Sequence, residues 1–279
     1  MKYDGMSNIK IGVIADRGHL EKKLVEFLNY ARSKAEVSLY LEETLVFDPE
    51  AFQSDEDVFL VKGKGDLILN LVKYLEETRS VPIINSFKGN FFAINRFLNS
   101  VYLQKAGISV PEFSLIPVDA PAPFREYIIK NIIDKRIYSF NPRIEEKNGN
   151  MQVIDERAWK EAYGDEQNYR YFFYQKFIKS QWEYKVYGIG EELFFYKQIP
   201  VLINPNKMES REKINKIPEL SESSYKAMEA LDLKLTSIDY LRDEEGNFYL
   251  TDINCTPNFN YIKRGPQMVV DYLIEQARN

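Results

Sequence analysis

The first hundred residues alternate between short apolar runs and segments whose apolar positions recur at helical spacing. The run at 9–15, IKIGVIA, is hydrophobic throughout, which is typical of a strand buried on both faces of a parallel sheet. The segment behind it has apolar residues every three or four positions, which predicts a single helix. These residues are Leu20, Leu24, Phe27, Leu28 and Ala31.

Three further apolar runs, at 37–41, 57–61 and 81–85, predict strands, and the spacing predicts helices at 66–78 and 90–106. Strands that alternate with helices imply parallel βαβ units. Residues 1–113, after an irregular leader of seven residues, are therefore predicted to form a small open α/β domain. The residues after its first strand, ADRGH, are no glycine-rich phosphate loop, so this domain alone is not expected to bind nucleotide.

After a proline-rich segment at 117–123, the pattern changes to alternation typical of hairpins. Strands are predicted at 126–131 and 169–178, followed by a hairpin with its turn at Gly190-Glu191. A helix is predicted at 222–231 with Ser221 as its N-cap, and another at 267–277. We expect two α+β units here, at 114–180 and 181–279.

The stretch 235–259, LTSIDYLRDEEGNFYLTDINCTPNF, carries the candidate chemistry. It reads as a hairpin around a four-residue loop, Asp243 to Gly246, in which Arg242 faces Asn247. In that register Ser237 faces Asp252 and Asp239 faces Leu250. Asp239, Asp252 and Asn254 then project from one face of the sheet. Two carboxylates and a carboxamide are the hard oxygen ligands that Mg²⁺ takes. The alternative is an ordinary polar face exposed to solvent.

Composition narrows the classes of function. The 37 basic and 42 acidic side chains give a net charge of -5, which disfavours a general nucleic-acid binder. A single cysteine, Cys255, suits a reducing cytoplasm, and we interpret it as a packing residue. One histidine, His19, permits no zinc cluster and makes a Ser-His-Asp triad improbable near a helix start. No apolar run is long enough to cross a membrane.

Several motifs resemble the ATP-grasp superfamily. The D…D-x-N pattern before Pro257 is similar to its metal-binding hairpin, which usually reads E-x-N; the DIN version here is similar to the inositol trisphosphate kinases. The linker, with I-N-S at 84–86 and K-A-G-I-x-x-P at 105–111, resembles RimK-like ligases. The resemblance runs from about residue 80 to 279. It implies an N-terminal open parallel α/β domain followed by an ATP-grasp fold of two α+β subdomains.

The same resemblance assigns roles by position. Arg96 and Lys130 stand where the family contacts ATP phosphates, and Lys185 and Lys197 where it places catalytic cations. The adenine hinge corresponds to Gln175, Lys176, Phe177 and Ile178, and the metal ligands to Asp239, Asp252 and Asn254. Without the resemblance, Arg96 and each lysine are interpreted as solvated surface charges, and the hinge as an aromatic core strand.

Two loops depart from the family pattern. The glycine-rich loop expected after Lys130 has a glycine only at Gly149, so side-chain charge from Lys135, Arg136 and Arg143 would have to replace backbone amides. Otherwise this loop no longer serves catalysis. The basic loop 204–216, with Lys207, Arg211, Lys213 and Lys216, lacks the family's glycines but takes the place of the substrate side of the cleft.

The resemblance therefore implies phosphoryl transfer from ATP with Mg²⁺, or Mn²⁺ in its place. The favoured function is a RimK-like carboxylate–amine ligase that acts through an acylphosphate on a small-molecule or peptide acceptor. The alternatives are a small-molecule kinase of the inositol phosphate type, acting on a hydroxyl, and a nucleotide-binding protein without turnover. We expect a cytoplasmic protein with neither nucleic-acid nor membrane partners; ligase or kinase, acceptor and oligomeric state stay open.

Overall fold

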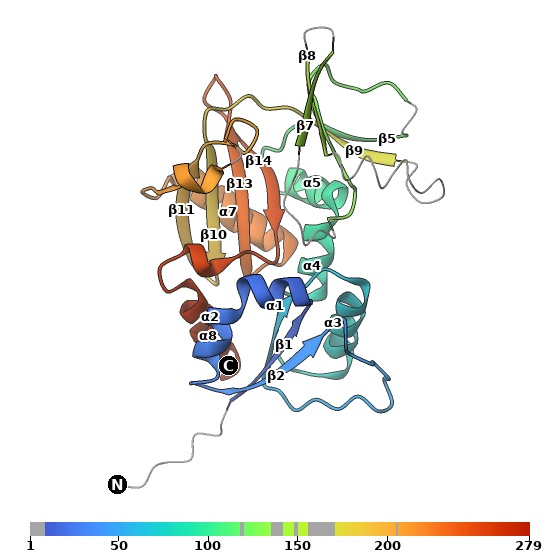
Figure 1. Cartoon of the computed structure of the whole chain (residues 1–279), viewed down its shortest axis with the longest axis vertical. Helices are drawn as coiled ribbons and strands as arrows, with labels where there is room; N and C mark the ends of the chain where they lie inside the picture. The colour runs from blue at the N-terminus through green and yellow to red at the C-terminus, as the bar shows by residue number, and fades with distance from the viewer. Residues whose placement is uncertain (1–8, 118–119, 135–141, 148–149, 156–170, 205) are drawn as a thin grey trace.

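Three β-sheets form the framework of the protein (Figure 1). The structure is a computed structural model that describes residues 9–117, 120–134, 142–147, 150–155, 171–204 and 206–279. The first sheet is parallel in the order β2-β1-β3-β4. Its strands are β1 (Lys10–Ala15), β2 (Glu36–Leu41), β3 (Val58–Lys62) and β4 (Ile83–Ile84). The predicted parallel α/β start of the chain is thus confirmed.

Two helices predicted as continuous are each broken in the structure. The first divides into α1 (Arg17–Lys23) and α2 (Val25–Ala31) at Leu24, and the second into α4 (Phe87–Ile94) and α5 (Arg96–Lys105) at Asn95. Asn95 has an extended backbone, and its side chain accepts a hydrogen bond from the Leu98 N–H as the N-cap of α5. The helix α3 (Asp66–Thr78) has the predicted bounds.

The second sheet is mixed and has the order β5-β9-β6-β8-β7. Its strands are β5 (Phe113–Pro117), β6 (Tyr127–Lys130), β7 (Pro142–Lys147), β8 (Asn150–Asp155) and β9 (Tyr171–Lys176). Ile116, Tyr127, Ile129, Phe172 and Tyr174 form its small hydrophobic core. The predicted strand ending in Lys130 and the aromatic strand are therefore neighbours in one sheet.

The third sheet is antiparallel and has the order β12-β11-β10-β13-β14. Its strands are β10 (Glu183–Ile189), β11 (Glu192–Gln198), β12 (Glu212–Lys213), β13 (Leu235–Arg242) and β14 (Phe248–Asn254). The turn between β10 and β11 lies at Gly190-Glu191, as predicted. Two short 3-10 helices, η1 (Lys207–Ser210) and η2 (Phe259–Tyr261), follow β11 and β14.

The helix packed on this third sheet, α7 (Pro218–Leu231), begins earlier than predicted. Pro218 takes the first helical position, where its missing N–H costs nothing and its fixed φ suits the helix. The predicted N-cap, Ser221, lies inside the first turn and donates its hydroxyl to the Ile217 carbonyl. The sequence does not distinguish the two positions, because serine is common both at N-caps and within the first turn of helices.

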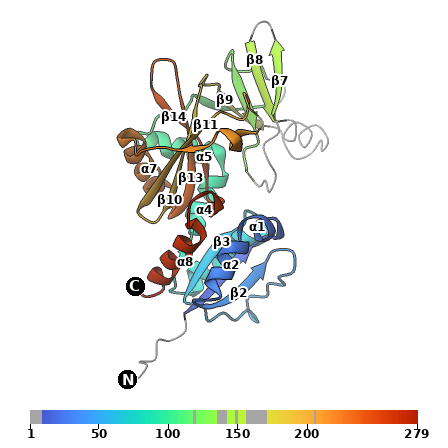
Figure 2. The same ribbon diagram turned by 60° about the vertical axis from the view of Figure 1, so that its left-hand side comes forward.

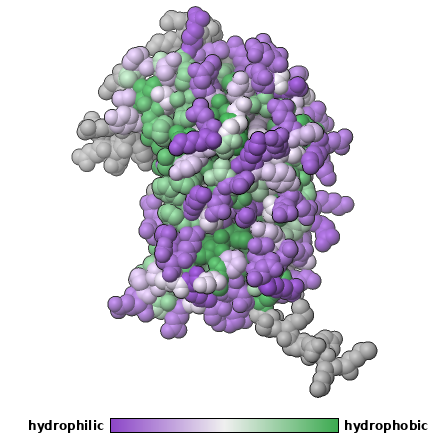
Figure 3. Space-filling view, turned by 180° about the vertical axis from the view of Figure 1, so that it is seen from behind, coloured by the Kyte–Doolittle hydropathy of each residue, from purple (hydrophilic) through white to green (hydrophobic). Residues whose placement is uncertain are grey.

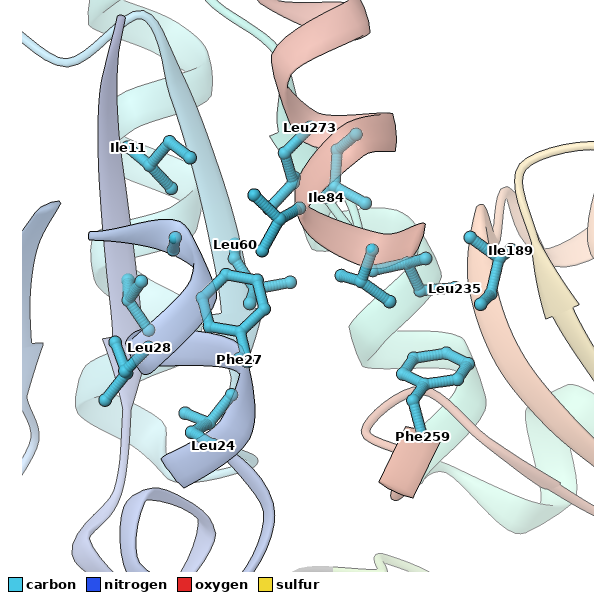
Figure 4. Packing of buried hydrophobic residues seen from close by; sticks show 14 of the residues in the cluster. Ile11, Leu24, Phe27, Leu28, Leu60, Ile84, Ile189, Leu235, Phe259 and Leu273 are labelled. Carbon is cyan, nitrogen blue, oxygen red and sulfur yellow. The ribbon is translucent and has the colours of Figure 1, made fainter. Parts of the chain in front are cut away.

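The C-terminal helix α8 (Gly265–Gln276) returns to the beginning of the chain and packs against α2 and β3 (Figure 2). Figure 4 shows Leu273 of α8 between Phe27 and Leu60 on one side and Leu235 on the other. One core therefore joins the first sheet to the third, and it holds the two against each other beside the candidate site.

The face opposite to that of Figure 1 is largely hydrophilic, with hydrophobic residues gathered in patches across its middle (Figure 3). Among the described residues, no helix has both the length and the apolar content that a membrane crossing needs.

Candidate functional site

The hairpin of β13 and β14 places the predicted metal ligands on one face, but in a register different from the predicted one. Asp239 pairs with Asp252, and Ser237 with Asn254. Towards the tip the register shifts, so that Arg242 faces Phe248 and five residues, not four, connect the strands. The predicted pairing of Asp239 with Leu250 is wrong for two reasons: the five-residue connection moves the register by one position, and a β-bulge at Thr251 in β14 moves it by one more. The bulge also brings the two carboxylates directly opposite each other.

Lys185 on β10 lies beside this acidic pair. It faces Asp239 across the sheet, and its ammonium forms an ion pair with the Asp239 carboxylate, with side chains 12% and 16% exposed. Burial lowers the pKa of Lys185, but the adjacent carboxylate outweighs burial and raises the pKa above its ordinary value. The carboxylate of Asp252 accepts no hydrogen bond from, and forms no ion pair with, any residue that the structure describes. One carboxylate is thus neutralised, and the other is available to a cation.

The strand end of β6 brings a second cation to the same place. The Lys130 ammonium donates to the Gln175 Oε1 at 2.9 Å and to the Thr251 carbonyl at 3.1 Å. It therefore bridges the second sheet to the bulge of the β13–β14 hairpin. Gln175 itself is 3% exposed, which fixes its carboxamide as a partner of Lys130.

The segment after β9 carries the predicted hinge. The N–H of Lys176 donates to the Glu112 carbonyl at 2.8 Å, and that of Phe177 to the Glu126 carbonyl at 3.1 Å. Of the predicted hinge, Gln175 to Ile178, this leaves the N–H of Ile178 with no hydrogen bond to the described residues. The Lys176 side chain is directed away and forms an ion pair with Glu112.

Arg96 sits at the first position of α5 and is 7% exposed. Its guanidinium donates to the Asn131 carbonyl at 2.9 Å and pairs with Asp134 at 3.1 Å. The second oxygen of Asp134 pairs with Lys64 at 2.8 Å, and this ion pair joins the segment after β3 in the first sheet to the segment after β6 in the second. Burial lowers the pKa of Lys64, but Asp134 reverses this and raises it, so Lys64 stays charged.

These elements enclose an open cleft of about 1050 Å³ between the second and third sheets. Nine of the predicted site residues line it: Arg96, Lys130, Gln175, Phe177, Ile178, Lys185, Asp239, Asp252 and Asn254. Lys176 and Lys197 are not among the lining residues.

Lys197 lies on the other face of the third sheet from Lys185. It pairs across the strands with Tyr184, whereas Lys185 pairs with Tyr196. Its ammonium pairs with Glu212 at 2.7 Å and lies 4.5 Å from the Trp182 ring centroid. The expectation that both lysines approach the metal from paired strands assumed one face, and adjacent strand positions of opposite parity separate them.

The opposite wall of the cleft carries residues that the sequence did not single out as a set. Arg211 donates to the Tyr187 hydroxyl at 3.1 Å and lies 4.7 Å from the Tyr261 ring centroid. Lys22 and Lys23 reach the same cleft from α1. Only the folding of α1 against the segment after β14 brings them there, so no local pattern signals them.

An apolar lip, formed by Ile203, Met208 and Tyr261, borders this wall. Their exposed fractions are 64%, 43% and 42%, which is unusual for large hydrophobic side chains grouped around a cleft.

Three predicted residues of the phosphate loop cannot be placed. Lys135 and Arg136 lie outside the described residues, and of Arg143 only the backbone, in β7, is described.

The fold as a whole is similar to known structures. The RimK domain ATP-grasp protein from Sphaerobacter thermophilus DSM 20745 is 17% identical, with a TM-score of 0.64, covering 95% of this chain and 99% of that one. D-alanine–D-alanine ligase from Bacillus anthracis, complexed with ATP, is 14% identical, with a TM-score of 0.67 and 97% of each chain covered. This chain has the ATP-grasp fold.

A third ATP-grasp structure, the RiPP-associated ligase of Chryseobacterium gregarium with ADP and a leader and core peptide, is 14% identical, with a TM-score of 0.66. It covers 96% of this chain and 97% of that one. At identities of 14 to 17%, these comparisons show a shared fold and nothing further. No protein-family model matches the sequence, and no curated protein matches it either.

The donor set of the hairpin fits a hard divalent cation. Within the described ranges no three His, Cys, Asp or Glu side chains gather as a metal cluster. A cation here would therefore have two carboxylates, one carboxamide and otherwise water or ligand oxygens. Mg²⁺ is bound in this way, through one or two carboxylates plus phosphate oxygens, in nucleotide sites.

Proposed function

We propose that this ATP-grasp protein is a Mg-ATP-dependent carboxylate–amine ligase. The observation that carries the proposal is the single cleft that collects Arg96, Lys130 and Lys185 opposite Asp239 and Asp252. Cations that face phosphates, next to carboxylates that face a divalent metal, are the complement needed to hold a nucleoside triphosphate.

In this proposal the phosphates lie between the second and third sheets. Lys130, anchored on Gln175 and Thr251, is the direct phosphate contact. The two terminal nitrogens of Arg96 are bonded to Asn131 and Asp134, and its buried Nε has no hydrogen-bond partner among the described residues. In this proposal Arg96 lies beneath the phosphates and adds positive charge to that side of the cleft. The N–H of Ile178 is the donor aimed at the adenine edge.

Asp239, Asp252 and Asn254 would hold Mg²⁺, which supplies charge neutralisation at the transferred phosphoryl group. Lys185 forms an ion pair with Asp239 and orients that carboxylate. The Lys185 side chain is only 12% exposed, so its positive charge is largely shielded from water. There it would stabilise the negative charge that develops during phosphoryl transfer. These roles need positioning and charge but no protein nucleophile.

The acceptor side supports a carboxylate substrate. Arg211 is pre-oriented by Gln198 at 2.6 Å and by the Tyr187 hydroxyl, and a guanidinium in a fixed pose suits a planar carboxylate. The apolar lip beside it suits an acceptor that also carries apolar groups, such as a peptide. Attack of that carboxylate on the γ-phosphoryl gives an acylphosphate and ADP, and an amine then displaces phosphate to form the amide.

A second function, a small-molecule kinase, is favoured by the additional cations on the acceptor wall. Lys22 and Lys23 add two charges to that of Arg211, which would suit an acceptor that is already phosphorylated. A hydroxyl of that acceptor would then keep the phosphoryl group.

The two functions separate by stoichiometry. The protein is incubated with Mg-ATP and a library of carboxylic acids, peptides, amines and polyol phosphates, and ADP and products are followed by mass spectrometry. The ligase forms amide and ADP only when acid and amine are both present. A phosphoester on one acceptor identifies the kinase, and nucleotide binding without ADP in any mixture rejects both.

A further inference from the structure

The segment after β14 is held by side chains from the beginning of the chain. The carbonyls of Cys255, Thr256 and Pro257 accept hydrogen bonds, one each, from the side chains of Asn85, Lys23 and Lys62. The three distances are 3.0, 2.9 and 2.8 Å. These bonds fix the backbone directly behind Asn254, the last predicted metal ligand.

His19 adds a contact of a different kind to this segment. Its Nδ1 lies 2.6 Å from the Asp16 Oδ2, and its Nε2 lies 3.0 Å from the Thr256 Oγ1. The Thr256 hydroxyl lies in turn 3.2 Å from the Asn254 Oδ1, which also accepts the Thr256 N–H at 3.0 Å. A continuous chain of polar groups thus runs from Asp16 to a candidate metal ligand.

The direction of each hydrogen bond in this chain follows from the charges. Burial raises the pKa of Asp16, but the bond from His19 outweighs it, so the pKa is lowered and the carboxylate only accepts. The proton therefore sits on Nδ1. Burial lowers the pKa of His19, and the charges of Lys23 and Lys62 lower it further. Asp16 raises it but does not compensate, so the pKa is lowered and the ring is neutral. A neutral ring protonated on Nδ1 has an acceptor at Nε2.

The Thr256 hydroxyl has one proton, and Nε2 takes it. Asn254 Oδ1 has two lone pairs, of which the Thr256 N–H occupies one. The second is left open because the hydroxyl proton points to the histidine. We propose that His19 is a positioning residue that keeps this lone pair of Asn254 available to the divalent cation. The inference rests on the proposed function, because it assumes that Asn254 is a ligand.

The same three groups do not make a nucleophilic triad. Thr256 has no exposed surface and His19 is 2% exposed, so no substrate reaches the hydroxyl. The arrangement instead resembles the outer-shell hydrogen bonds that orient metal ligands in other proteins, whose loss weakens metal binding.

The test measures Mn²⁺ affinity in the presence of ADP by electron paramagnetic resonance, with thermal unfolding as a check on the fold. His19→Asn keeps a donor for Asp16 but has no atom at the Nε2 position. The buried Thr256 hydroxyl then turns to Asn254, and we expect Mn²⁺ to bind about tenfold more weakly.

Thr256→Val removes the competing proton. Alone it is expected to keep the affinity of the parent protein, and combined with His19→Asn it is expected to restore that affinity. A purely structural role for His19 predicts no rescue. His19→Gln, whose carboxamide oxygen reaches towards the Nε2 position, is expected to bind Mn²⁺ like the parent and keeps the test valid if the asparagine variant does not fold.

Three results overturn the inference alone: parent-like affinity in His19→Asn, a double variant as weak as His19→Asn, or a loss of affinity in His19→Gln equal to that of His19→Asn. If the unmodified protein with ADP binds no Mn²⁺, the proposed function fails as well.

Discussion

At the scale of single residues, the candidate site is an arrangement of compensated charges. Lys185 neutralises Asp239 and Asp134 joins Arg96 to Lys64, while the Asp252 carboxylate forms no ion pair or hydrogen bond within the described residues. Burying one charge of a pair without the other is costly, so each pair constrains the elements that carry it. A cation would gain the most favourable electrostatic energy beside the Asp252 carboxylate, with which no ammonium or guanidinium of the described residues pairs.

The ion pair of Lys185 and Asp239 provides the first prediction. Lys185→Met leaves Asp239 without its partner and should lower the free energy of unfolding by about 3 kcal/mol without ligand. Mg²⁺ with ADP should recover part of this loss, because the metal replaces the missing positive charge. Urea unfolding with and without Mg-ADP measures both effects.

Lys197→Met is the matched control, since Lys197 pairs with Glu212 in a half-exposed position outside the cleft. It should change the free energy of unfolding by less than about 1 kcal/mol. Equal losses in the two variants, or no recovery with Mg-ADP in Lys185→Met, would contradict the assigned role.

At the scale of elements, the sequence predicts most strands and helices but not their interruptions. The Gly190-Glu191 turn, the bounds of α3 and ten of the described strands follow from periodicity and turn residues, whereas β5, β7, β8 and β12 were not predicted. The breaks at Leu24 and Asn95 do not, because helical periodicity continues through both. The bulge at Thr251 is likewise invisible, since a bulge depends on the pairing of two strands, not on one strand's pattern.

The break at Asn95 provides the second prediction. Asn95→Ala removes the cap of α5 and should destabilise the protein by about 1 kcal/mol, together with weaker ATP binding, because Arg96 follows directly. Asn70→Ala, in the exposed middle of α3, is the control and should be neutral or slightly stabilising. Isothermal titration with ATP and thermal unfolding provide the two measurements; an unchanged ATP affinity would separate the cap from the site.

At the scale of the whole molecule, the two ends of the chain build one site. The open α/β start and the ATP-grasp body were predictable from residue patterns and resemblance. Two features were not predictable: α8 packs on α2, and α1 brings Lys22 and Lys23 to the cleft and His19 to Thr256 behind it. Such contacts join residues more than two hundred positions apart, and only the complete fold determines them.

The shared core provides the third prediction. Leu273 is fully buried between the first and third sheets, so Leu273→Ala should lower the free energy of unfolding by about 3 kcal/mol. It should also weaken Mn²⁺ binding, because α8 helps to hold the first sheet behind Asn254. Ile274→Ala, at the partly buried neighbouring position, is the control with a smaller loss. A single unfolding transition whose midpoint does not move would show that the two sheets are not coupled.

The buried lysines predict how stability depends on pH. Burial, followed by the charge of Lys64, lowers the pKa of Lys23 to about 8. Between that value and the ordinary lysine pKa the unfolded chain binds a proton that the folded protein lacks, so this residue makes stability rise with pH. Between pH 8 and pH 10, the free energy of unfolding of the parent should rise by about 1 to 2 kcal/mol relative to that of Lys23→Met. Urea unfolding at the two pH values tests this, and a relative loss would reverse the assigned sign.

In the proposed function, the hairpin of β13 and β14 holds a divalent cation together with a nucleotide. Mn²⁺ binding in the presence of ADP tests this, compared between the parent protein, Asp252→Asn and the control Glu244→Gln at the exposed hairpin tip. We expect Asp252→Asn to fold as stably as the parent but to lose Mn²⁺ affinity by at least about tenfold, and Glu244→Gln to bind Mn²⁺ like the parent. Equal Mn²⁺ affinity in the parent and Asp252→Asn would show that this hairpin does not hold the cation.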